Sequence, residues 1–134
     1  GNMFENTIAF ARIIASGLLD QHPNLKLVCP HLGGTLPYIS GRMDHQIAVL
    51  KRSSQKLQRT PSEYMRSVYL DMVSPLAEAM RFALDFSGPD KLLFSSDHPW
   101  VEPKHILEPM QSLNLPPDQQ AAILGGNARK LFQL

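Results

Sequence analysis

The chain has 134 residues, with 13 Lys and Arg against 12 Asp and Glu, so its formal net charge is +1. This length predicts one small domain, and the balanced charge gives no whole-chain attraction for nucleic acid or an anionic membrane. No apolar run approaches the roughly 20 residues that cross a bilayer. The single cysteine, Cys29, excludes an internal disulfide and a multi-cysteine zinc site. Since no signal-peptide pattern is visible, we expect a reducing, cytoplasmic setting.

The first part of the chain predicts a helix, a strand and a second helix. Apolar residues at spacings of three and four over 4–19 are typical of an amphipathic helix, which Pro23 ends. The β-prone run 25–29 predicts a strand that stops at a glycine-rich loop, 30–34. A long polar helix is expected over about 39–57, with four cations near its end: Lys51, Arg52, Lys56 and Arg59. We interpret these cations as a solvated helix face rather than a patch for an anionic partner.

Two start signals organise the rest of the chain. Residues 60–63, Thr-Pro-Ser-Glu, form a capping box that opens a short helix before the second predicted strand, 68–73. Ser74-Pro75 repeats the pattern and predicts a helix through Phe86, which glycine and proline end. A third strand is expected at 91–95. Helical segments then follow over 104–113, 117–124 and 128–132, the last capped by Asn127.

Three strands, each followed by a helix, imply parallel pairing through right-handed crossovers. The predicted fold class is therefore α/β. A complete (β/α)8 barrel takes about 250 residues, so the length excludes one within this chain.

Two of the predicted strands end in residues that can do chemistry. His31 follows the first strand and precedes two glycines, and Asp97 follows the third beside His98. Because the carboxyl ends of parallel strands meet at one rim, we expect this pair to lie at a shared ligand-binding edge. There they could serve as metal ligands, or as general base and metal ligand. The alternative is that His31 only bonds its own loop and Asp97 only caps a turn.

Other polar residues are weaker candidates. Asp71 lies inside the second strand, where a buried carboxylate must be paired; a structural salt bridge and a site role are both open. Arg42 could clamp a substrate carboxylate in bidentate fashion. Cys29 is interpreted as a small core side chain rather than a nucleophile. The remaining histidines are expected at the surface: His22, His45 and His105.

Three motifs in order resemble one known family. His31 to Tyr38 with Gly41-Arg42 resembles the His-x-Gly-Gly-x-x-Pro…Gly-Arg segment of the amidohydrolase-related metal-dependent hydrolases, most of all their aminocarboxymuconate-semialdehyde decarboxylase branch. The stretch 93–100 is similar to the family's Gly-Ser-Asp-Tyr-Pro strand end, and 125–131 is similar to its closing Gly-Asn-Ala-x-x-Leu. The resemblance covers essentially the whole chain.

The family is built as a (β/α)8 barrel with a divalent metal, usually zinc, at its rim. The resemblance implies that residues 1–134 are one domain, the C-terminal portion of such a TIM barrel, with three parallel strands equivalent to strands 6–8 and flanking helices. It implies that His31 is the catalytic histidine, Asp97 a metal ligand and Arg42 a substrate-binding residue that can reach across a dimer interface. The family's His-x-His pair and its later metal-binding histidine have no counterpart here. His98 replaces an aromatic neighbour of the aspartate, and we favour a space-filling role for it over metal binding.

These observations leave three hypotheses for function. The first is a metal-dependent hydrolase acting on a small carboxylic acid, with a non-oxidative decarboxylase as the alternative; this chain alone would be inactive in either case. The second is a catalytically silent domain that self-associates as a homodimer or higher assembly, because three parallel strands leave two open edges and an apolar face. The third is a small binding module that uses the rim without metal. None calls for nucleic acid or a membrane as partner.

Overall fold

The computed structural model describes all residues, 1–134. The strands are β1 (Val28–Cys29), β2 (Tyr69–Asp71) and β3 (Leu92–Leu93). The α-helices are α1 (Asn2–Ala15), α2 (Leu18–Gln21), α3 (Leu36–Asp44), α4 (Pro61–Ser67), α5 (Ala77–Ser87), α6 (Lys104–Ser112), α7 (Pro117–Ala121) and α8 (Asn127–Phe132). Tighter or wider helical turns lie at His31–Gly33, His45–Val49, Pro89–Lys91 and Ala122–Gly126. None of the helices combines the length and apolar character needed to cross a membrane.

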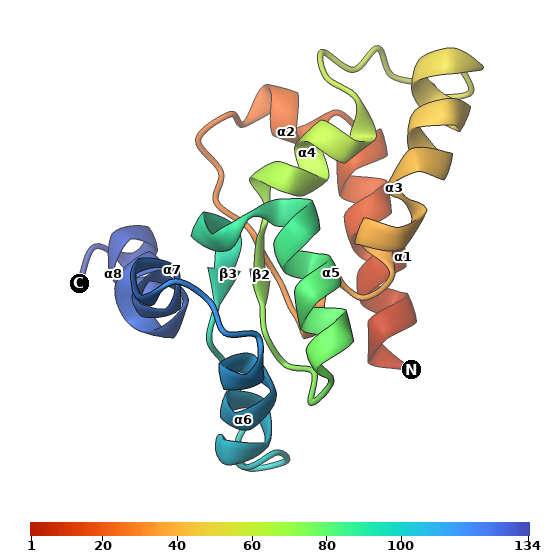
Figure 1. Ribbon diagram of the computed structural model, residues 1–134. Coiled ribbons are helices and arrows are strands. Elements are labelled where there is room, and N and C mark those ends of the chain that lie inside the picture. The colour runs from red at the N-terminus through yellow and green to blue at the C-terminus, as the bar shows by residue number, and fades with distance from the viewer.

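The three strands form one parallel sheet in the order β1-β2-β3, as expected (Figure 1). Cys29 lies opposite Leu70, and Leu70 lies opposite Leu92, so these three side chains share one face of the sheet. All three are buried, and they belong to one core with side chains of α1, α4, α5 and α6. Val28 and Tyr69 share the other face and are more exposed.

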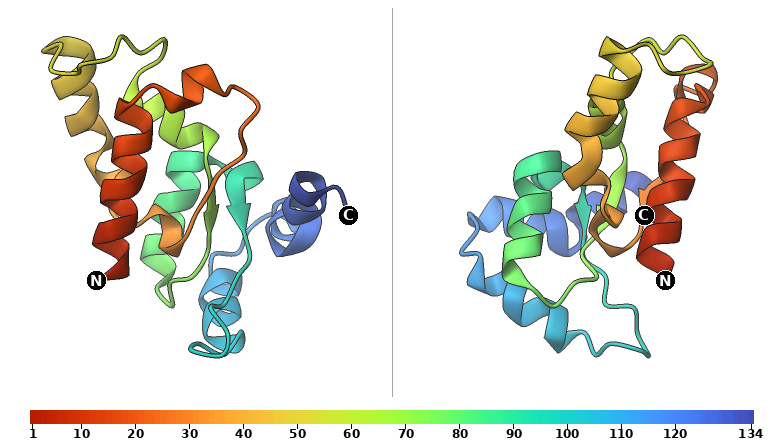
Figure 2. Two further views of the ribbon diagram at one scale, coloured as in Figure 1. Left: turned by 180° about the vertical axis from the view of Figure 1, so that it is seen from behind. Right: turned by 90° about the vertical axis from the view of Figure 1, so that its right-hand side faces the viewer.

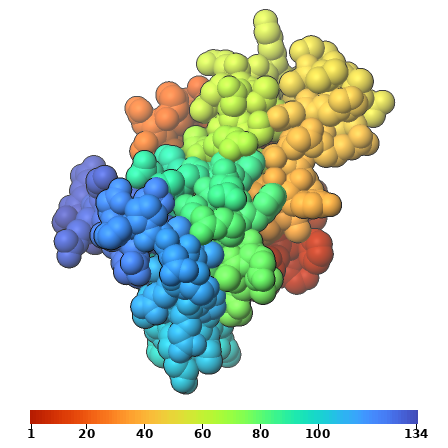
Figure 3. Space-filling model, viewed as in Figure 1, coloured from red at the N-terminus to blue at the C-terminus, as the bar shows by residue number.

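The sheet has two functionally different ends. In Figure 1 the chain leaves β2 and β3 at the lower end, near α6, while the segment 45–60 lies at the upper end. Figure 2 shows α1 and α3 on one side of the sheet and α7 and α8 on the other. The space-filling view shows the segment 45–60 projecting at the upper right (Figure 3). The carboxyl ends of the strands, where His31 and Asp97 follow, therefore lie far from this projection.

Two predicted helices are shorter than expected. The helix over 4–19 is divided, because Gly17 takes a left-handed conformation with φ 74° between α1 and α2. The helix over 39–57 ends with the π-helical turn at His45–Val49, and Lys51 then takes a φ of 55°. The Ser53 hydroxyl accepts the Gln55 amide at 3.2 Å, a local bond that competes with helix formation. The four cations near this segment are exposed, as expected, but they lie on a loop.

One predicted start signal is confirmed and the other is wrong. The capping box is present: Glu63 Oε2 accepts the Thr60 amide at 2.7 Å, and α4 starts at Pro61. These hydrogen bonds from Thr60 lower the pKa of Glu63. Ser74 does not open a helix, because its amide donates to Met72 O at 2.7 Å and the chain is still turning away from β2. Helix α5 begins only at Ala77.

Asn127 does not cap a helix either; it covers one edge of the sheet. Its Nδ2 donates to Pro89 O at 2.7 Å and to Leu92 O at 2.8 Å, and the Phe94 amide donates to Ile123 O at 3.0 Å. The carbonyl oxygen of Leu93 accepts the Met72 amide on the side of β3 that faces β2. Backbone groups of successive residues in a strand point to opposite sides, so the Leu92 carbonyl and the Phe94 amide face the other edge of β3. The expectation of two open edges is therefore wrong, since the edge of β3 is occupied by the C-terminal segment.

Candidate functional site

His31 begins a left-handed turn at the carboxyl end of β1. Four consecutive residues have positive φ: His31 (56°), Leu32 (52°), Gly33 (78°) and Gly34 (62°). For a residue with a side chain, this conformation costs about 1–2 kcal/mol. The turn is closed by the Gly34 amide, which donates to His31 O at 2.9 Å. Such a conformation persists only when its surroundings hold it, so the neighbours of the turn decide where the imidazole lies.

Asp71 holds the start of this turn. Its Oδ1 accepts the His31 amide at 2.7 Å and the Val73 amide at 3.1 Å, which ties the end of β2 to the loop after β1. Burial raises the pKa of Asp71, and hydrogen bonds from these amides partly offset the increase. The salt-bridge interpretation of Asp71 is wrong, because the one ion pair of the chain joins Lys104 to Glu102 at 2.8 Å.

Thr7 of α1 holds the end of the turn. Its hydroxyl donates to Met3 O at 2.7 Å and accepts the Thr35 amide at 2.9 Å. A Cβ atom at Gly34 would lie 2.6 Å from both Met3 O and Thr7 Oγ1. Glycine is therefore required at this position, where the backbone of the turn approaches α1 most closely.

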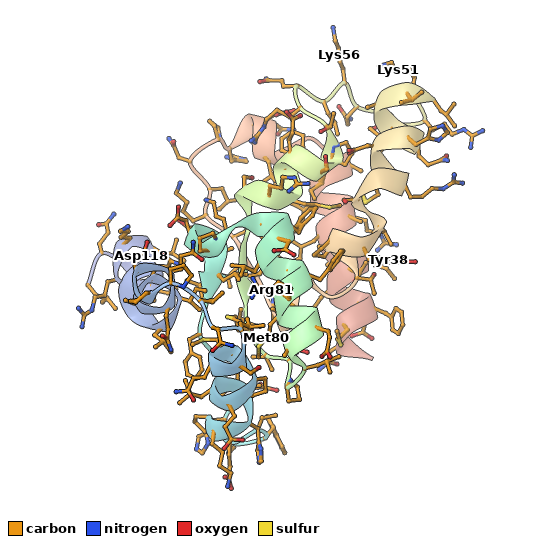
Figure 4. The ribbon with its side chains drawn as sticks, viewed as in Figure 1. Tyr38, Lys51, Lys56, Met80, Arg81 and Asp118 are labelled. Carbon is orange, nitrogen blue, oxygen red and sulfur yellow. The ribbon has the colours of Figure 1, made fainter.

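A mostly apolar cavity of about 200 Å³ lies beside the turn. His31 and Tyr38 line it on one side and Met3, Phe82 and Ser74 on others, so α1, α3 and α5 all contribute. Tyr38 projects from α3 into solvent and is 83% exposed (Figure 4). The cavity places apolar surface next to a histidine.

Asp97 lies at the same edge of the sheet, one strand beyond β2. It has a φ of 63° and is exposed, and its backbone oxygen accepts the Trp100 amide at 2.9 Å. The turn is thus made by the backbone of Asp97, while its carboxylate makes no hydrogen bond within the chain. Two strand spacings separate the ends of β1 and β3, about 10 Å. His98 is also exposed, and the space-filling role expected for it stays a prediction.

The residues of this chain do not fit a complete metal site. No group of three or more His, Cys, Asp or Glu side chains is close enough to hold an ion. A divalent metal normally takes at least three protein ligands; at this rim the Asp71 carboxylate is occupied by backbone amides, and Asp97 is the carboxylate that makes no hydrogen bond within the chain.

Arg42 is not brought to His31. It lies six residues into α3, about 9 Å along the helix axis from the rim, and is exposed with no acidic partner. The other histidines are exposed, as expected: His22, His45 and His105. Cys29 is completely buried, and burial together with the Asp71 charge raises the pKa of its thiol to about 12. It is a core side chain, as interpreted from the sequence.

Of the two residues that anchor the turn, sequence reasoning singled out Asp71 without its partners and missed Thr7. Asp71 gave a signal, a carboxylate inside an apolar strand, but the pattern did not reveal that backbone amides would be its partners. Thr7 gave none, because a threonine on the face of an amphipathic helix is ordinary. Gly34 was noted only as part of a glycine pair.

Comparisons with known proteins agree on one family. The family model described as Amidohydrolase matches residues 1–134. A gamma-resorcylate decarboxylase of Rhizobium sp. (strain MTP-10005) is 29% identical over 133 residues, which cover 97% of this chain and 41% of that enzyme. A 2-amino-3-carboxymuconate-6-semialdehyde decarboxylase of Dictyostelium discoideum is 25% identical, over 97% of this chain and 37% of that enzyme.

A solved structure shows the same arrangement of strands and helices. A dihydroxybenzoic acid decarboxylase of Polaromonas sp. JS666, with bound manganese and the inhibitor 2-nitroresorcinol, superposes with a TM-score of 0.85 at 29% identity. The superposition covers 96% of this chain and 40% of that enzyme. The chain thus spans about two fifths of the proteins it matches, and its three parallel strands with flanking helices correspond to part of a TIM barrel, as predicted. The chain belongs to the amidohydrolase family.

Proposed function

We propose that the protein carrying this chain is a non-oxidative decarboxylase of a small carboxylic acid, and that residues 1–134 form the C-terminal portion of its barrel. One structural observation carries the proposal: His31 is fixed at the rim, between Asp71 and Thr7, beside an apolar cavity. The gamma-resorcylate and 2-amino-3-carboxymuconate-6-semialdehyde enzymes named above favour decarboxylation over the hydrolysis that we considered first, because both are decarboxylases.

The reaction needs a proton donor and no oxidant. The bond between the carboxylate and its carbon breaks, the electron pair stays on that carbon, CO2 leaves, and a proton takes its place. We assign that proton to His31, because an imidazole exchanges protons near neutral pH and this one lines the cavity. Arg42 would bind the substrate carboxylate. Since it lies away from the rim of its own chain, this role requires a second copy, and we therefore propose a dimer.

Asp97 would contribute one carboxylate ligand to a divalent cation, with the other ligands coming from outside these 134 residues. Zinc was our expectation from the sequence, whereas the Polaromonas enzyme holds manganese. The bound cation would supply positive charge at the rim for an anionic substrate.

Sequencing the gene upstream of the Gly1 codon tests the first part of the proposal. We expect an open reading frame that encodes strand-like segments and a His-x-His pair. A reading frame that begins at this codon would contradict the partial-barrel assignment.

Product analysis of the complete protein tests the second part. Incubated with Mn²⁺ or Zn²⁺ and a panel of hydroxybenzoic acids including 2,6-dihydroxybenzoate, it should release CO2 and one phenol per substrate consumed. Products that keep the carboxyl group would favour the hydrolase hypothesis instead.

A further inference from the structure

The carboxylate of Asp71 has a role that neither the motifs nor the relatives assign. It lies at the carboxyl end of β2, between the two strands whose ends bear His31 and Asp97. Its hydrogen bonds go to backbone amides of the neighbouring loops rather than to a basic side chain. A half-buried carboxylate that accepts only amide hydrogen bonds fixes backbone geometry, because each of its partners belongs to the main chain.

One of the two amides that Asp71 binds, that of His31, begins a strained segment. His31 and Leu32 are successive residues in the left-handed region, which residues with a side chain rarely adopt. The Asp71 carboxylate accepts the His31 amide at 2.7 Å, at the first residue of this segment. Without the carboxylate, the turn loses the partner that favours positive φ at His31, and the ordinary extended conformation becomes available.

We propose that Asp71 is a positioning residue, whose carboxylate holds the left-handed turn that presents the His31 imidazole at the rim. That Asp71 holds the turn follows from its hydrogen bonds to the His31 and Val73 amides. That this affects catalysis rests on the proposed function. Asp71→Asn keeps an oxygen at the same place, whereas Asp71→Ala removes the acceptor. Asp44→Ala is a matched control, because Asp44 Oδ1 also accepts a backbone amide, that of Ser62 at 2.8 Å, at the other end of α3.

The structural test uses NMR on this chain and does not depend on activity. In Asp71→Ala the amide resonances of His31 and Leu32 should move and the HN–Hα coupling of His31 should change. Asp71→Asn should retain the coupling of the wild type, and Asp44→Ala should leave both resonances in place. An unchanged His31 coupling in Asp71→Ala overturns the proposal. If that variant does not fold, a changed coupling in Asp71→Asn with native dispersion elsewhere overturns it as well.

The kinetic test uses the complete protein once decarboxylation is established. Asp71→Ala should lower kcat by about 10- to 100-fold with little change in KM, the range seen when a group that orients a reacting side chain is lost. Asp71→Asn should recover most of that loss, and Asp44→Ala should keep the wild-type kcat. A kcat for Asp71→Ala within twofold of wild type overturns the positioning role. Absence of decarboxylation in the wild type would instead count against the proposed function, and the NMR result would still decide the inference.

Discussion

We expect Gly34 to tolerate substitution poorly. Its φ of 62° and ψ of −121° suit glycine alone, and a Cβ atom would meet Met3 O and Thr7 Oγ1 at 2.6 Å. Gly34→Ala therefore combines a backbone cost of about 1–2 kcal/mol with an overpacking cost of about 1–3 kcal/mol. Gly17→Ala is the matched control, since φ is 74° there but the nearest atom is 3.8 Å away.

Urea unfolding followed by circular dichroism measures the difference. With an m-value of about 2 kcal/mol per M, Gly34→Ala should lower the midpoint by about 1–2 M, and Gly17→Ala by less than about 1 M. The excess in Gly34→Ala is the cost of separating α1 from the turn. Equal midpoints for the two variants would refute the close approach of Thr7 and with it the anchoring of His31.

Three further predictions concern residues away from the turn. Cys29, with a pKa of about 12, should not react with a thiol reagent at pH 8 in the folded chain and should react fully in concentrated guanidinium chloride; rapid labelling of the native chain would contradict its burial. Asn127→Ala should lower the free energy of unfolding by about 1–3 kcal/mol, because it leaves the Leu92 carbonyl unpaired; an unchanged melting temperature would show that the β3 edge is not held by this side chain. Glu63 has a lowered pKa in the folded chain, so its stabilising effect is present above the ordinary value of 4.5 and is lost as the pH falls through the folded value. Glu63→Gln should flatten the acid limb of a stability–pH curve, and an identical limb in both proteins would count against the capping box.

The parallel strands, and the placement of His31 and Asp97 at their carboxyl ends, were predictable from the sequence because they depend on local patterns. Short apolar runs stop at glycine or proline, and parallel strands place their carboxyl ends together, so the sequence predicts His31 and Asp97 at one edge. The lengths of the strands were not predictable from the sequence, because they depend on contacts distant in sequence. After β1 the backbone amide of His31 bonds the Asp71 side chain, and at β3 the Leu92 carbonyl bonds the Asn127 side chain.

The details that position the site depend on contacts distant in sequence. The Thr7 hydroxyl accepts the Thr35 amide because α1 packs beside the turn. No periodicity in the sequence predicts this hydrogen bond. Arg42 was expected in the helix entered from the His31 loop, and it lies near the far end of α3, away from the rim. The Ser74-Pro75 pair has the composition of a helix start. However, the Ser74 amide donates to the Met72 carbonyl in the turn that follows β2, and no helix begins there.

The proposed dimer can be tested by measuring the mass of the complete protein in solution. Exposed aromatic side chains remain on the chain, with Tyr38 at 83% and Trp100 at 84%, and the edge of β1 is not covered by the C-terminal segment. We expect light scattering of the complete protein to give at least twice the mass of one chain. A monomer at high concentration would remove Arg42 from the proposed carboxylate site.

The most direct test of the account is the activity of His31→Ala in the complete protein, with His22→Ala as control. His22 is an exposed histidine that lies before β1 and lines no part of the cavity beside the turn. With 2,6-dihydroxybenzoate or the best acid of the panel, His31→Ala should lose about 100-fold or more in kcat, the contribution of a positioned proton donor, and His22→Ala should keep the wild-type rate. Wild-type decarboxylation by His31→Ala would contradict the central claim that the anchored turn presents the catalytic histidine.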